Sequence, residues 1–257
     1  MGRGRGSATQ KLEQGEHTNH ATNPVGICCG SLDDALEAER GGADRVELCS
    51  ALFLGGLTPS LGTVIEAKAL LKIPIMVMVR LRGAGFCYTQ PELAIMERDT
   101  ALALERGADG IVFGVLNQDG AIDEDQCKQI RRLIGDRQAV FHRAFDVTPD
   151  PFKALDQLVE LGITRVTSGQ EDSVPEGAPL IKRLIDYAGD RIEILPGGGI
   201  QLHNLRQVVE STGCKQVDLT AFRTQSDPST SHQFLRPTPS GTSRIRARLK
   251  TGNAGAT

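Results

Sequence analysis

The feature that most constrains this chain is a series of eight short apolar runs that alternate with longer segments of helical period. Each apolar run has the length of a buried parallel strand, and each segment between two runs is long enough for a helix. Repeated β–α units of this kind predict an α/β protein with a parallel sheet. The strands are expected near residues 25–30, 45–50, 73–80, 110–116, 138–145, 165–169, 191–196 and 216–221.

Two architectures accommodate such a repeat. Eight parallel strands is the number in a (β/α)8 barrel of the TIM type, whereas a doubly wound open sheet also alternates strands with helices. We favour the barrel because the repeat supplies eight strands and because no GxGxxG turn follows the first of them. The pattern stops after Arg223, so the final helix of the barrel is expected to be missing or irregular.

The chain is expected to divide into one large domain and two ends. Residues 1–23 carry almost no bulky apolar side chains and are predicted to be a disordered leader, because they cannot offset the entropy cost of ordering. Residues 24–223 hold the barrel repeat. Residues 224–257 are rich in Ser, Thr, Pro, Gly and Arg and are predicted to be an irregular basic tail.

Charge, hydropathy and cysteine usage exclude several classes of protein. The net charge is -3, and because both ends are positive the barrel itself is acidic, which argues against a nucleic-acid partner. No apolar run approaches the roughly 20 residues of a spanning helix, and the first residues lack the apolar core of a signal peptide. The six cysteines show no CxxC spacing, so a cytoplasmic protein with reduced thiols and no membrane partner is predicted.

Candidate functional residues follow from the rule that the active face of a (β/α)8 barrel lies at the carboxyl ends of its strands. In this sequence, side chains that can bind a metal, transfer a proton or hold an anion gather at those ends. They are Cys28, Glu47, Cys49, Arg80, Arg82, His142, Arg143, Asp146, Thr167, Ser168 and the run Gly197, Gly198 and Gly199.

Strand parity separates two cysteines from the others. Successive side chains of a strand point to opposite faces, so Cys28 is expected to point into the barrel and Cys29 away from it. On the next strand, Glu47 and Cys49 both point inward by the same rule. Two thiols on strands about 4.8 Å apart could hold one soft ion such as Cu(I) between them. The alternative is that both cysteines pack as small buried apolar residues.

The charged groups at the strand ends suggest a second kind of chemistry. Ionisable groups at the ends of apolar strands must be paired with an opposite charge, hydrated, or involved in the function of the protein. Glu47, His142 and Asp146 are candidates for acid–base catalysis, and Arg80 and Arg82 are candidates for an anion clamp. The glycine run would let backbone N–H groups approach a small anionic or phosphorylated ligand. The alternative is an internal network of ion pairs that closes the barrel.

Seven segments, taken in order, resemble one known family. They are GGADRVELCS, GGLTPS, MVRLRGAGFCY, ADGIVFGVLNQDGAID, VFHRAFD, VTSG and PGGGI. Together they resemble the copper homeostasis protein CutC family over residues 24–223. The resemblance implies a (β/α)8-type barrel that handles copper in the cytoplasm, in animals also in the nucleus, and binds Cu(I) through Cys28 and Cys49. It also implies a homo-oligomer, and it brings no established enzymatic activity.

Three places depart from the family pattern. Gly26 stands where an acidic residue is expected two positions before the first cysteine, and Asp218 stands where the eighth strand carries a histidine. The usual RPRGGDF appears as RLRGAGF at residues 80–86. Both candidate thiols are present, so we predict an intracellular barrel that buffers or delivers Cu(I). The alternative is an enzyme acting on a small anionic or phosphorylated substrate.

The missing helix has a consequence for stability. Val217 and Leu219 on the last strand face the place that an eighth helix would cover. Burying such side chains contributes about 1.5–3 kcal/mol each. We therefore expect part of residues 224–257, or a second copy of the chain, to cover them.

Overall fold

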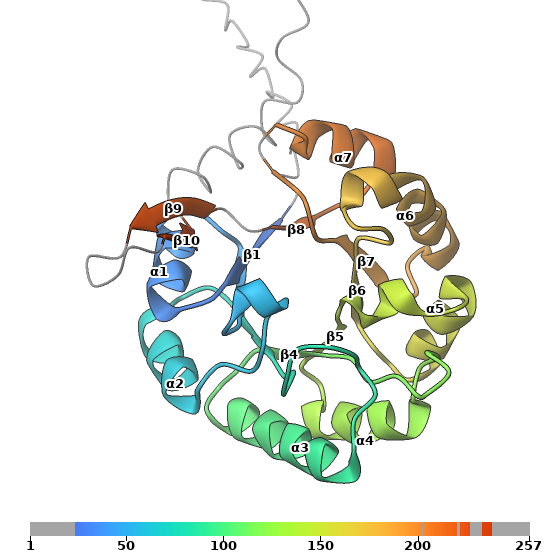
Figure 1. The fold of residues 1–257 in the computed structure, drawn as a ribbon, viewed down its shortest axis with the longest axis horizontal. Helices are drawn as coiled ribbons and strands as arrows, with labels where there is room; N and C mark the ends of the chain where they lie inside the picture. The colour runs from blue at the N-terminus through green and yellow to red at the C-terminus, as the bar shows by residue number, and fades with distance from the viewer. Residues whose placement is uncertain (1–23, 202, 220–221, 227–232, 238–257) are drawn as a thin grey trace, which may run out of the picture.

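The computed structural model describes residues 24–201, 203–219, 222–226 and 233–237. Within these ranges, eight strands form the main sheet and seven α-helices surround it (Figure 1). The strands are β1 (Val25–Cys29), β2 (Arg45–Leu48), β3 (Ile75–Met78), β4 (Gly110–Phe113), β5 (Gln138–Phe141), β6 (Arg165–Ser168), β7 (Glu193–Pro196) and β8 (Val217–Leu219). The helices are α1 (Leu32–Arg40), α2 (Leu61–Leu70), α3 (Gln90–Glu105), α4 (Glu124–Ile134), α5 (Pro151–Glu160), α6 (Val174–Ala188) and α7 (Leu205–Thr212).

The order of the strands defines a barrel. Each strand from β1 to β6 pairs in parallel with the next one in the chain, and β8 returns to pair in parallel with β1. A single bridge between Gly197 and Asp218 joins β7 to β8, so the barrel is nearly closed. This confirms the predicted (β/α)8-type fold and excludes the doubly wound sheet, in which the order of the strands reverses midway.

Local sequence signals explain where the helices begin and end. The side chain of Ser31 accepts a hydrogen bond from the backbone of α1, and Asp150 does the same for α5, which starts at Pro151. Gly213 ends α7 in a left-handed conformation that glycine adopts without strain. Each helix is thereby confined to the segment between two strands.

The interior of the barrel is layered from its amino end to its carboxyl end. At the amino end, the buried side chains of Arg45 and Arg165 bond to Gln216 and Glu193. Above them lies a small apolar cluster formed by Met76, Met78, Val112, Val140 and Cys49. The main apolar core lies outside the barrel, between the strands and the helices. The polar side chains at the carboxyl end of the barrel therefore pack on an apolar layer.

Strand β5 is shorter than the expected 138–145. It ends at Phe141, and a 3-10 helix, η2 (Arg143–Val147), follows. The cause is His142, whose Nδ1 atom accepts a hydrogen bond from the backbone N–H of Ala144 and turns the chain. Arg143 and Asp146 thus lie on a turn beyond the strand.

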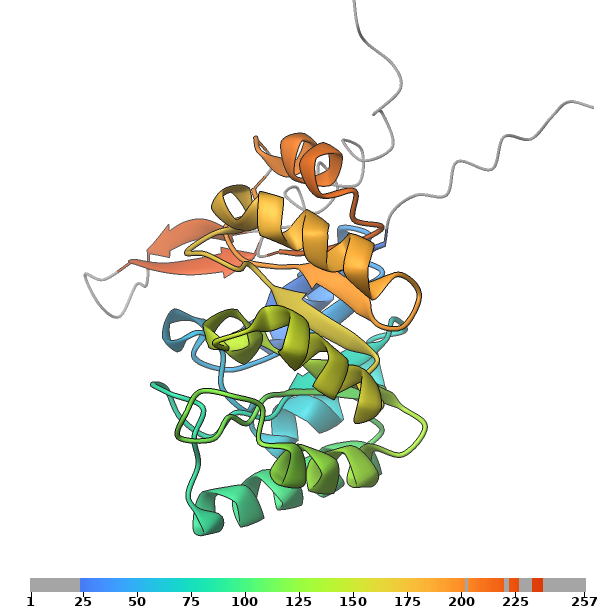
Figure 2. The ribbon, with the colours of Figure 1, turned by 90° about the vertical axis from the view of Figure 1, so that its right-hand side faces the viewer.

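No eighth helix follows β8 in the part of the chain that the structure describes. Instead, β9 (Phe222–Ser226) and β10 (Gln233–Pro237) form an antiparallel hairpin, and β10 lies against α1 (Figure 1). In side view the hairpin projects at one end of the barrel (Figure 2). Part of residues 224–257, which were expected to be irregular, therefore forms β-strands.

Two other expectations concern the ends of the chain and the membrane. Val217 and Leu219, which were expected to need cover, are buried. The predicted disordered leader, residues 1–23, lies outside the described residues. No described helix has the length and apolar character needed to cross a membrane.

Candidate functional site

The carboxyl ends of the strands surround a cavity of about 690 Å³. Of the residues predicted from the sequence, those that line it are Cys28, Glu47, Arg80, His142, Arg143, Asp146, Thr167, Gly197 and Gly198. Those that do not line it are Cys49, Arg82, Ser168 and Gly199. The cavity therefore joins most of the candidates in one place.

Two thiols and a carboxyl group meet at the wall of this cavity. Strand register places Cys28 directly beside Glu47, and Cys49 comes two residues after Glu47, just past the end of β2. The Sγ atom of Cys28 lies 3.3 Å from Oε1 of Glu47, and that of Cys49 lies 3.7 Å from the same oxygen. The three potential ligand atoms all lie within 4.8 Å of one another. This is the distance range in which side chains can share one metal ion.

Asp218 completes this group from β8. Its Oδ2 atom accepts a hydrogen bond from the Cys28 thiol at 3.4 Å, and the residue is buried. Asp218 is the register partner of Gly26 on β1. The absence of a side chain at Gly26 leaves the space that the Asp218 carboxyl group occupies.

Burial shifts the protonation of all four groups. It raises the pKa of Glu47 to about 8, with Asp218 adding to the rise, and it also raises the pKa of Asp218. The hydrogen bond with Cys49, together with burial, raises the pKa of Cys28 well above its usual range. For Cys49, the hydrogen bond with Cys28 lowers the pKa, but burial and the carboxyl groups raise it by more. At neutral pH both thiols and Glu47 therefore favour their protonated forms.

A cationic and aromatic group forms another part of the wall. Arg80 follows β3 and is buried, and its guanidinium lies 5.2 Å from the centre of the Phe86 ring. The same ring lies 5.0 Å from the imidazole of His142. Burial and the charge of Arg80 lower the pKa of His142 to about 3, so this imidazole is neutral.

Asp146 organises the loops around β6 and β7 rather than presenting a free carboxylate. Its oxygens accept hydrogen bonds from Arg143 Nε at 2.7 Å, Ser168 Oγ at 2.8 Å and the Gly169 N–H at 3.0 Å. The guanidinium of Arg143 lies where a Cβ atom on Gly198 would clash with it, at 2.7 Å. The candidate base is thus engaged by its neighbours.

The glycine run divides between two roles. A Cβ atom at Gly197 would lie 2.7 Å from Thr167, and both residues line the cavity. A Cβ atom at Gly199 would instead lie 2.6 Å from Ser173, outside the cavity. Gly199 therefore lets the loop after β7 pack against the segment that precedes α6.

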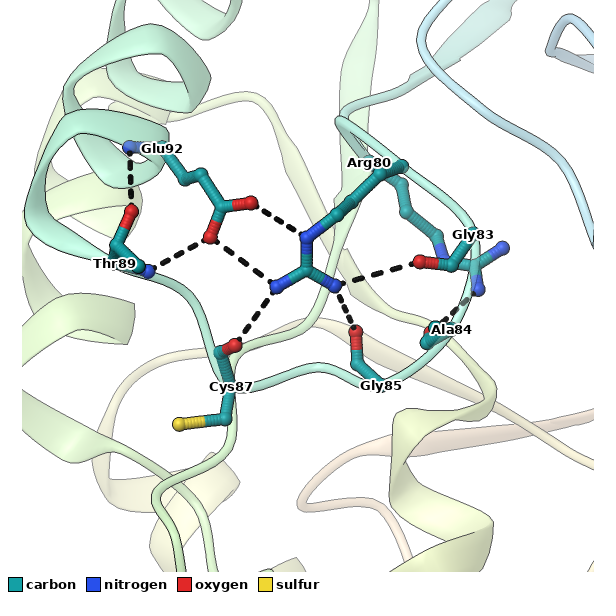
Figure 3. Close-up of polar contacts among 8 residues, drawn as sticks. Arg80, Gly83, Ala84, Gly85, Cys87, Thr89 and Glu92 are labelled. Atoms are coloured by element: carbon teal, nitrogen blue, oxygen red, sulfur yellow. Dashed lines mark hydrogen bonds and ion pairs between the residues drawn. The ribbon is translucent and has the colours of Figure 1, made fainter.

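Arg82 does not join the other charged residues. Its Nε atom bonds to Glu92 at 2.5 Å, and its other nitrogens bond to the carbonyls of Gly83, Gly85 and Cys87 (Figure 3). Its guanidinium thus lies between the carbonyls of its own loop and Glu92 on α3, and it does not line the cavity. Its role in the structure is to fix the shape of the loop between β3 and α3.

Some residues of the site gave little signal in the sequence. Phe86 lies on an irregular loop, so strand parity could not place it against Arg80 and His142. Asp218 has inward parity on the last strand, which was the available signal for its position. Its contact with the Cys28 thiol arises because β8 pairs with β1, and a sequence pattern does not reveal this pairing.

The fold and the site together define a (β/α)8-type barrel in which a cluster of two thiols and two carboxyl groups lies at the carboxyl ends of the strands. The sequence profile of the CutC family matches residues 24–223, and the chain belongs to this family. This confirms the resemblance found in the sequence motifs.

Individual relatives agree with this assignment. A family protein CutC from Treponema denticola is 50% identical over 207 residues, covering 80% of this chain and 84% of the relative. The copper homeostasis protein cutC homolog of Homo sapiens is 46% identical over 200 residues, covering 77% of this chain and 73% of the relative. A crystal structure of a CutC protein from Streptococcus agalactiae has a TM-score of 0.73 at 38% identity, covering 77% of this chain and 98% of that one.

Proposed function

We propose that this protein takes part in copper homeostasis by binding one Cu(I) ion per chain through the thiols of Cys28 and Cys49, and that it buffers or delivers the ion. The observation that carries the proposal is the group of Cys28, Glu47 and Cys49, whose ligand atoms lie within 4.8 Å of one another. Family membership adds that relatives bear the name of copper homeostasis proteins.

The chemistry of the donors favours Cu(I) over harder ions. Thiolate sulfur is a soft ligand that selects Cu(I), whereas Mg²⁺ and Ca²⁺ prefer sites made of oxygen. Two sulfur atoms bonded to one ion at about 2.3 Å each lie at most about 4.6 Å apart. The two sulfur atoms lie within 4.8 Å of each other, so at most a small shift brings them within that limit. Glu47 would hydrogen-bond to the sulfur atoms or supply a third ligand.

The protonation of the site implies that metal binding releases protons. Both thiols carry raised pKa values, and a thiol must lose its proton to bind a metal. Affinity for Cu(I) is therefore expected to rise with pH. Cys28 lines the cavity while Cys49 is buried behind it, so the ion would enter through the cavity and reach Cys28 first.

Titration with Cu(I) against a competing chelator tests the proposal. The wild type is expected to bind one ion per chain, and the Cys28→Ser/Cys49→Ser double variant is expected to bind about a hundredfold more weakly or not at all. Cys29→Ala is the matched control, because its thiol bonds to the carbonyl of Ile27 in the outer core. If the double variant keeps the stoichiometry and affinity of the wild type, the ion binds elsewhere.

Location and assembly are part of the same proposal. We expect the protein to act in the cytoplasm, with the nucleus as a second location, and to form a homo-oligomer. The support is the resemblance to the family. Sedimentation of the purified chain tests the oligomeric state, and a monomer at all concentrations would contradict it.

A further inference from the structure

Arg80 is a buried cation without a carboxylate partner among the described residues. Its guanidinium donates hydrogen bonds to the backbone carbonyls of Leu54, Gly56 and Ala84. Carbonyl dipoles solvate the group but leave its charge uncompensated. A buried charge is costly unless an opposite charge accompanies it, so an anionic ligand beside Arg80 would stabilise this group.

Three polar atoms on the wall of the same cavity also lack partners among the described residues. They are Nε of Arg80, Nε2 of His142 and Oγ1 of Thr167. The His142 ring accepts a hydrogen bond at Nδ1, so in its neutral form the proton lies on Nε2 and that atom is a donor. All three atoms can therefore donate a hydrogen bond, and buried donors in proteins are normally satisfied.

Phe86 covers two of these donors. Its ring contacts both Arg80 and His142, and it belongs to the loop between β3 and α3. Two arginines hold this loop in place (Figure 3): Arg80 donates a hydrogen bond to the carbonyl of Ala84, and Arg82 donates to three other carbonyls of the loop, those of Gly83, Gly85 and Cys87. Phe86 itself is only partly buried and lines the cavity. Rotation of its side chain would open the two donors to the cavity without unfolding the loop.

We propose that the cavity binds a small organic oxyanion, whose charged group accepts hydrogen bonds from Arg80 Nε and His142 Nε2 in place of the Phe86 ring. Thr167, which lies on β6, contacts a second polar group of the same molecule. The ligand class is a carboxylate or a phosphate monoester, since both present oxygen acceptors and negative charge. A cavity of about 690 Å³ is of the size that holds small metabolites.

This site is separate from the proposed copper ligands. None of its three donors belongs to Cys28, Glu47 or Cys49, although Cys28 lines the same cavity. Anion binding is therefore expected in metal-free protein. Its failure would leave the copper proposal intact, and loss of copper binding in the cysteine variants would leave the anion site intact.

Calorimetric titration of metal-free protein at constant ionic strength tests the proposal. The probes are inorganic phosphate, glycerol 3-phosphate and malate, with glycerol as the neutral control. We expect at least one of the two organic anions to bind once per chain, and the one that binds identifies the phosphate or the carboxylate as the group recognised. The imidazole N–H signal of His142 in NMR spectra is expected to shift on binding.

Variants of the two donors locate the site. Affinity for the binding probe is expected to fall at least tenfold in His142→Leu and in Arg80→Lys, and to be retained or to rise in Phe86→Ala. Arg131→Lys is the matched control, because Arg131 also donates to backbone carbonyls but lies outside the cavity. If Arg80→Lys does not fold, the affinity of His142→Leu alone tests whether the anion binds at this site. Absence of saturable binding, or unchanged affinity in His142→Leu, would overturn the proposal.

Discussion

Gly26 and Asp218 form a pair in which the missing side chain of one residue leaves space for the side chain of the other. The two are register partners on β1 and β8, and a Cβ atom at Gly26 would lie 2.6 Å from Oδ1 of Asp218. With no side chain at position 26, the carboxyl group in this space comes from Asp218 on β8. The missing side chain at Gly26 thus leaves room for the carboxyl group that accepts the hydrogen bond of the Cys28 thiol.

The first prediction follows from this contact. Gly26→Ala is expected to destabilise the protein by about 1–3 kcal/mol, because the added methyl group overpacks a site that has no room. Urea unfolding measures the change. Gly62→Ala is the control, since its Cβ would meet only Ser60 Oγ at 3.8 Å on α2. A double variant with Asp218→Ala is expected to cost less than the sum of the two single changes.

His142 gives the protein a dependence on pH that can be measured. Its pKa in the folded state is about 3, below its usual 6.5, so the unfolded chain binds the proton more readily. Stability is therefore lost as the pH falls from about 6.5 toward 3. Between pH 7 and pH 5 the expected loss from this residue is about 2 kcal/mol.

The control for this prediction is the His142→Gln variant. Glu47 titrates in the opposite sense, since its raised pKa means that the folded state gains stability as the pH falls from about 8 to 4.5. That contribution is present in both proteins and cancels when their urea unfolding curves are compared. Equal losses in wild type and variant between pH 7 and pH 5 would show that His142 is not the cause.

At the scale of elements, periodicity accounts for what the sequence could predict. The alternation of apolar runs and helical segments predicted the eight strands, and parity correctly placed Cys28 and Glu47 on the inner face. The sequence could not predict that β5 ends at Phe141, because a side chain of His142 caps the following turn. It also could not predict the position of Arg82, because a loop has no period that fixes the direction of its side chains.

The β9–β10 hairpin stands in the place of a regular final element and carries the next prediction. Deleting residues 222–257 is expected to lower the melting temperature by several degrees, because β10 lies against α1 next to the strands that lack an eighth helix. Deleting only residues 238–257 separates the hairpin from the rest of the tail. An unchanged melting temperature in the longer deletion, together with a monomeric wild type, would show that the barrel needs no cover there.

In the molecule as a whole, the apolar core and the candidate site occupy different regions. The outer core of the barrel holds the helices on the strands, and its interior supports polar groups at one end on a layer that includes Met76 and Met78. The Cys28 thiol, the carboxyl groups of Glu47 and Asp218, and the guanidinium of Arg80 therefore line one cavity apart from the main core. The sequence predicted this cavity because all strands of a parallel barrel end on one face.

The proposal that Cys28 and Cys49 hold copper can be tested by X-ray absorption at the copper edge of Cu(I)-loaded protein. We expect sulfur to dominate the nearest neighbours of copper in the wild type and in Cys29→Ala. We expect this sulfur signal to disappear in Cys28→Ser/Cys49→Ser. A copper environment made of nitrogen and oxygen alone in the wild type, or a sulfur signal that persists in the double variant, would contradict it.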